Sequence, residues 1–125
     1  MPERVYVCDE AEYQALKKAL EYDPYLDKSL DDEKLRALKD DKYANVIFSR
    51  QEYSLREGAA MGLEKGKYYL YIKANDDFLK SADDRLAHEF KSVKRAPPDA
   101  ESKVIALINE EQSKANEGFG SIFGG

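Results

Sequence analysis

Two residue types that often carry chemistry, histidine and cysteine, occur once each in this chain of 125 residues, as His88 and Cys8. A single histidine cannot build a multi-histidine metal site, and acid–base catalysis by His88 requires a cleft and a partner group supplied by the fold. Cys8 ends an apolar run and is followed by Asp9 and Glu10, whose negative charges disfavour a thiolate. We therefore expect His88 on a helix surface and Cys8 as a buried, unreactive thiol, with no catalytic residue in the chain.

Two further segments have the composition of ligand sites without the spacing that such sites require. The segment DPYLDKSLDD, residues 23–32, contains four aspartates but lacks the alternating acidic residues and central glycine of a calcium loop. The segment GAAMGLEKGK, residues 58–67, has glycines and a lysine without the spacing of a phosphate-binding loop. A lone cysteine also excludes a cysteine-rich metal site. We therefore predict no metal, no cofactor and a non-enzymatic protein.

The composition limits the class of protein and of partner. Apolar residues make up 42% of the chain and charged residues 36%, as in a globular domain with a highly charged surface. The segment MPERVYVCDE does not have the pattern of a signal peptide, and no apolar run approaches the roughly 18–20 residues of a membrane span. We therefore expect a cytoplasmic protein that does not bind membranes. The net charge of −5 argues against a general nucleic-acid binder, although residues 45–98 carry a basic excess.

The hydrophobic pattern predicts one α+β domain over residues 1–117. Strands are expected near 4–8, 45–57, 67–74 and 91–95, and helices near 10–22, 27–41, 76–90 and 98–117. Asp9 and Glu12 have the form of a capping box, and Gly118 is expected to end the last helix. This order predicts a ferredoxin-like split βαβ core at about 4–96, with an antiparallel four-stranded sheet, an extra short helix in the first crossover and an added C-terminal helix. Residues 118–125 form a glycine-rich tail.

The predicted strand KYYLYIKA, residues 67–74, holds three tyrosines, and side chains alternate between the two faces of a strand. We expect the more aliphatic side of this strand and of the first strand to face the helices together: Val5, Val7, Tyr68, Leu70, Ile72 and Ala74. The opposite face then becomes the candidate binding face, which consists of Arg4, Tyr6, Lys67, Tyr69, Tyr71 and Lys73. This face either stacks a ligand or is covered by the last helix or by a second copy of the chain.

Two of these strands resemble the motifs of the RNA-recognition-motif family. VYVCDE is similar to the first-strand motif, with Tyr6 at the stacking position, and KGKYYLYI is partly similar to the third-strand motif, with Tyr69 at an aromatic position. Lys67 and Tyr68 depart from that motif. The resemblance implies a module that binds single-stranded RNA through Tyr6, Tyr69 and Tyr71.

The segments KYYLYIKA, EFKSVKRA and GFGSIFGG together resemble a small archaeal family with no assigned function. That resemblance implies a cytoplasmic, oligomeric protein without catalytic residues. The tail contains Phe119, Ile122 and Phe123, which are apolar enough to fold back on the domain, to reach a neighbouring subunit or to dock on another protein. We therefore expect a domain that self-associates or binds a protein partner through the sheet face or the tail, with RNA binding as the alternative.

Overall fold

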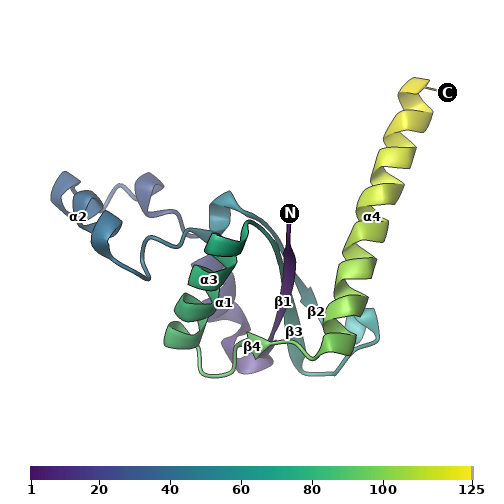
Figure 1. Ribbon diagram of the computed structural model, residues 1–125, viewed down its shortest axis with the longest axis horizontal. Coiled ribbons are helices and arrows are strands. Elements are labelled where there is room, and N and C mark those ends of the chain that lie inside the picture. Colours follow the sequence, from purple (N-terminus) through teal and green to yellow (C-terminus); the bar gives the residue numbers. More distant parts are fainter. Residues whose placement is uncertain (125) are drawn as a thin grey trace.

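The computed structural model describes the backbone of residues 1–124 and the side chains of residues 1–116. The protein is an α+β domain built on one antiparallel sheet of four strands, in the order β2-β3-β1-β4 (Figure 1). The strands are β1 (Glu3–Asp9), β2 (Glu52–Glu57), β3 (Lys67–Lys73) and β4 (Lys94–Arg95). The two longest strands therefore lie at the centre, and β2 and β4 form the edges.

Helices cover both faces of this sheet. Helices α1 (Tyr13–Glu21) and α3 (Asp76–Glu89) lie on one face, and α4 (Pro98–Gly124) lies on the other (Figure 1). The short α2 (Asp32–Ala37) belongs to a connection between α1 and β2 that projects away from the sheet. No helix within the described residues is long and apolar enough to cross a bilayer.

Local capping chemistry sets the starts of two helices. The Asp31 carboxylate accepts a hydrogen bond from the Lys34 N–H at 2.8 Å, at the start of α2. The Asn75 side chain accepts one from the Phe78 N–H at 2.8 Å, at the start of α3. Each side chain satisfies a backbone donor that has no partner within its own helix.

The register of the two central strands determines which side chains share a face. Val5 lies opposite Tyr71, and Tyr6 lies opposite Leu70. Residues directly opposite one another in an antiparallel pair point to the same face. The face under α4 therefore carries Val5, Val7, Tyr69 and Tyr71. The face under α1 and α3 carries Tyr6, Cys8, Leu70 and Ile72.

This arrangement corrects the predicted sheet faces. Val5 and Val7 do not share a face with Leu70 and Ile72, because β1 is shifted by one residue relative to the expected pairing. Alternation within each strand is as predicted. A shift of one residue between strands moves every side chain of one strand to the other face, and local periodicity does not specify that shift.

Several local features also differ from the predictions. Helix α2 covers only Asp32–Ala37 of the helix expected at 27–41, and β4 covers only Lys94–Arg95 of the strand expected at 91–95. The Asp9 side chain makes no cap hydrogen bond, because it pairs with Lys67 instead. Strand β2 begins at Glu52 rather than near residue 45, since residues 46–48 are buried beneath the helices without joining the strand ladder. Helix α4 continues past Gly118, because a glycine costs a helix only about 1 kcal/mol relative to alanine and does not prevent it.

Candidate functional site

The structure does not bring the six residues of the candidate binding face together. Arg4 and Tyr6 lie on the α1 and α3 side of the sheet, where both bind Asp83 of α3. The Arg4 guanidinium donates to the Asp83 carboxylate at 2.6 Å, and the Tyr6 hydroxyl donates to the other carboxylate oxygen. Burial and the Asp83 carboxylate raise the pKa of Tyr6 well above its ordinary value. This cluster holds β1 against α3, and the protonated phenol is unsuited to act as a base.

The other tyrosines of the candidate face lie beneath α4. The exposed fraction is 4% for Tyr69 and 0% for Tyr71, and both belong to the apolar cluster that includes Val104 of α4. The Tyr71 hydroxyl donates to the Glu3 carboxylate at 2.6 Å. Burial is the main reason that the pKa of Tyr71 is raised, and the contact with Glu3 raises it further. Base stacking requires an open aromatic face, whereas these rings are covered by the chain's own helix.

The two lysines of the candidate face lie at the ends of β3. Lys67 forms an ion pair with Asp9 of the neighbouring strand β1, and Lys73 is partly exposed at the opposite end of β3. Tyr69, which lines a pocket together with Lys67, is buried. The six residues therefore form no single binding surface.

His88 lies on the exposed side of α3, where its ring stacks on Tyr43 with centroids 3.9 Å apart. An open groove of about 520 Å³ adjoins it, between α3 and the connection that holds α2. The charged groups of this groove serve other contacts. Asp41 accepts hydrogen bonds from two backbone N–H groups of its own turn, which lower its pKa, and Arg85 donates to the Val46 carbonyl and to Glu89. The charged groups of the groove that flank His88 therefore already have hydrogen-bond or ion-pair partners among the described residues.

Cys8 is the buried thiol that the sequence predicts. Its exposed fraction is 2%, and burial, together with the nearby Glu12 and Asp9 carboxylates, raises the pKa of Cys8 to about 11. Within the described part of the chain, no group of three or more histidine, cysteine or acidic side chains is placed to hold a metal ion.

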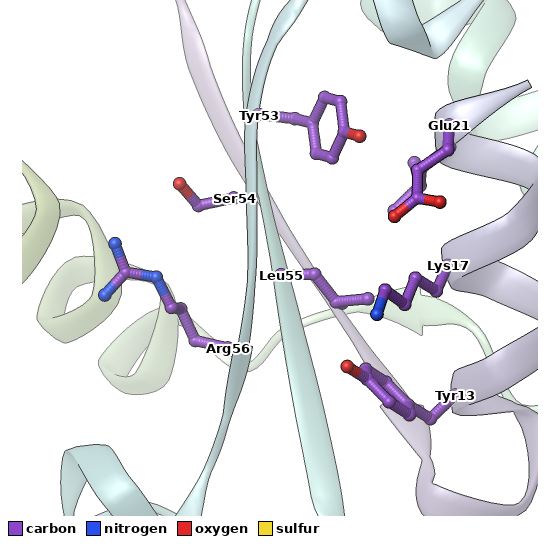
Figure 2. Close-up of a pocket in the computed structure, with 8 residues that line it drawn as sticks. Tyr13, Lys17, Glu21, Tyr53, Ser54, Leu55 and Arg56 are labelled. Atoms are coloured by element: carbon purple, nitrogen blue, oxygen red, sulfur yellow. The ribbon is translucent and has the colours of Figure 1, made fainter.

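A second cavity, of about 340 Å³, opens between α1 and the edge strand β2 (Figure 2). From α1 it is lined by Tyr13, Lys17, Leu20 and Glu21. From β2, the side chains of Tyr53 and Leu55 point into the space facing α1, whereas Ser54 and Arg56 point away from α1. This alternation gives the edge strand an apolar side and a polar side.

The backbone of β2 is paired on one side only. The Gly58 N–H donates to the Lys67 carbonyl at 2.8 Å, which sets the phase of the ladder with β3. Because hydrogen-bonded and non-hydrogen-bonded pairs alternate in an antiparallel ladder, Glu52, Ser54 and Arg56 bond to β3. The N–H and C=O groups of residues 53, 55 and 57 therefore point outward, toward a side where the described residues supply no further strand.

The two edges of the sheet differ in how they are protected. Strand β4 has only two residues, both charged, and is followed by Pro97 and Pro98. Short length, charge and proline are the features that prevent an edge from pairing with another strand. Strand β2 has six residues and no proline, and Tyr53 and Leu55 on its apolar side are partly exposed. Strand β2 is therefore the edge that is competent to accept another strand.

Helix α4 contacts the polar side of β2 through long side chains. The Arg56 guanidinium donates to both carboxylate oxygens of Glu111, at 3.0 and 2.8 Å. Gln112 donates to the Glu52 carboxylate at 3.3 Å. These contacts orient Glu52 and Arg56 on the α4 side of the sheet.

The residues of this edge are not among the site residues predicted from the sequence. The only signal for it is the alternation in EYSLRE, residues 52–57, in which opposite charges flank an apolar pair and a serine. The predicted contact residues of the tail, Phe119, Ile122 and Phe123, lie outside the side chains that the structure describes.

Comparison with known proteins gives no match for this chain: no family model, no curated protein and no solved structure matches it.

Proposed function

We infer a ferredoxin-like arrangement for the core. The element order β1-α1-β2-β3-α3-β4 supports it, because each βαβ unit places its two strands on either side of a strand from the other unit. Helix α2 then lies in the first crossover, and α4 is an addition that covers the second face of the sheet.

We propose that the protein is a non-enzymatic, cytoplasmic domain that self-associates. The observation that carries this proposal is the open β2 edge, where outward-pointing backbone groups lie beside the partly exposed Tyr53 and Leu55. An unprotected edge of this kind pairs readily with another strand. The burial of Tyr69 and Tyr71 leaves the sheet face unavailable, so the edge, with or without the tail, replaces it as the contact surface.

Light scattering coupled to size-exclusion chromatography tests the proposal on the full chain over a wide range of concentrations. We expect a dimer or a larger oligomer whose dissociation is favoured by the substitution Leu55→Lys, which places a charge on the apolar side of the edge. The matched control is Leu26→Lys, at a position whose exposed fraction is 78%, and it should leave the assembly unchanged. A chain that lacks residues 118–125 separates the contribution of the tail from that of the edge. A monomer at every concentration would overturn the proposal.

A further inference from the structure

We propose that two copies join by antiparallel pairing of their β2 strands, with Ser54 of each copy at the two-fold axis. The two four-stranded sheets then form one continuous sheet. This inference rests on the proposed self-association and adds to it the partner strand, the register and the pairs of side chains that select this register.

The hydrogen-bonding phase of β2 restricts the possible registers. Residues 53, 55 and 57 direct their backbone groups outward, whereas residues 52, 54 and 56 are bonded to β3. In an antiparallel pair, a residue with outward backbone groups must lie opposite another such residue. Only registers that place odd-numbered residues opposite odd-numbered residues therefore satisfy the backbone.

Charge distinguishes the registers that remain. With Ser54 at the axis, Tyr53 lies opposite Leu55 of the second copy, and Glu52 lies opposite Arg56. If Tyr53 were at the axis instead, Glu52 would lie opposite Ser54 and Leu55 opposite Gln51, so both ion pairs would be lost and Leu55 would face a polar side chain. Placing Leu55 at the axis would set Glu52 opposite Gly58 and would remove both ion pairs. The Ser54 register is therefore the one that combines two opposite-charge pairs with two apolar pairs.

The ion pairs and the apolar pairs of this register lie on opposite sides of the sheet. Glu52 and Arg56 lie on the α4 side, at positions without ladder hydrogen bonds to the second copy, where opposing side chains approach most closely. The terminal nitrogens of Arg56 bind Glu111, and this bond orients the guanidinium while its Nε–H remains for a second carboxylate. Tyr53 and Leu55 lie on the α1 side, beside the cavity of Figure 2, and the second copy would extend this apolar surface.

The test uses two charge substitutions, E52R and R56E, purified separately and then mixed. In each variant alone, both ion pairs of the dimer become like-charge pairs, and we expect dimerisation to weaken by about ten- to hundredfold. In the mixture, the arginines at positions 52 and 56 of the E52R chain face the glutamates at positions 56 and 52 of the R56E chain. Native mass spectrometry should therefore show a heterodimer about as stable as the wild-type dimer.

The control is Glu57→Arg, which makes the same charge change on the same strand at a position that lies opposite Gln51, and it should dimerise like wild type. The E52R variant keeps the bond between Arg56 and Glu111, so its result can be interpreted even if R56E weakens the packing of α4. Circular dichroism checks that each variant is folded. A wild-type dimer that is unaffected by E52R, or a mixture that fails to restore dimerisation, would overturn this register while self-association stands. A monomeric wild type would overturn self-association as well.

Discussion

The substitution Val104→Ala tests whether α4 covers the sheet as the structure describes. Val104 has an exposed fraction of 0% and belongs to the same apolar cluster as Val5 and Tyr71. The change removes two methyl-sized groups from this contact. It leaves the polar bonds that join α4 to β2 in place.

The expected cost follows from the burial. Two buried methyl-sized groups are worth about 1.6 kcal/mol in transfer free energy. The cavity that they leave adds about 1 kcal/mol, because the surroundings relax only in part. Alanine recovers about 0.5 kcal/mol through its higher helix propensity. We therefore expect the free energy of unfolding to fall by about 2 kcal/mol.

Urea unfolding followed by far-ultraviolet circular dichroism measures this change. All variants are compared at one protein concentration, because self-association would make the apparent stability depend on concentration. The control is Asn109→Ala, an exposed position on the same helix, which should be neutral or slightly stabilising. A loss below about 0.5 kcal/mol for Val104→Ala, typical of a surface site, would refute the assignment of α4 as the cover of this face.

Three further predictions concern positions away from this contact. Cys8, whose pKa is raised to about 11, should react slowly with a thiol reagent near neutral pH and rapidly after unfolding; fast reaction of the native protein would contradict its burial. Gly58→Ala would place a Cβ 2.5 Å from the Glu64 carbonyl oxygen and should lower the free energy of unfolding by about 1–3 kcal/mol, whereas an unchanged melting temperature would exclude this contact. The Glu12 carboxylate accepts hydrogen bonds from Ser92, which hold the pKa of Glu12 below its ordinary value of 4.5. The stabilisation from this contact should therefore be present above pH 4.5 and be lost as the pH falls through the lowered pKa. Wild type should therefore lose its advantage over Glu12→Gln in acid, and equal stabilities at every pH would show that this contact contributes nothing.

Local physical chemistry accounts for the parts of the fold that the sequence predicts. Helices α2 and α3 have Asp31 and Asn75 as their N-caps, each of which lies within three residues of the backbone donor that it satisfies. The burial of Cys8 follows from its place in an apolar strand. The α+β class and an apolar helix after Pro98 follow in the same way from periodicity and from proline.

The capping box predicted at Asp9 and Glu12 fails because long-range partners bind these side chains more effectively than the local backbone does. Asp9 pairs with Lys67 of β3. Glu12 accepts hydrogen bonds from the backbone of Lys91 and Ser92, which lie far away in the sequence. Neither partner is visible in the spacing of the residues around Asp9.

By itself, the sequence determined which residues of each strand share a face, and it indicated an apolar helix able to cover a sheet. Only the tertiary structure decided that Val5 lies opposite Tyr71, which placed the tyrosines under α4 and dispersed the predicted binding face. The reason is that alternation is a property of one strand, whereas the shift between two strands depends on hydrogen bonds and packing between distant segments. The tyrosines of β3 do not specify the register either. A tyrosine ring can be buried while its hydroxyl reaches a partner, as the Tyr71 hydroxyl reaches Glu3, so these residues are compatible with a covered face as well as an open one. The edge position of β2 depends on the order of all four strands, whereas the pairing of its outer backbone groups is a property of the folded sheet.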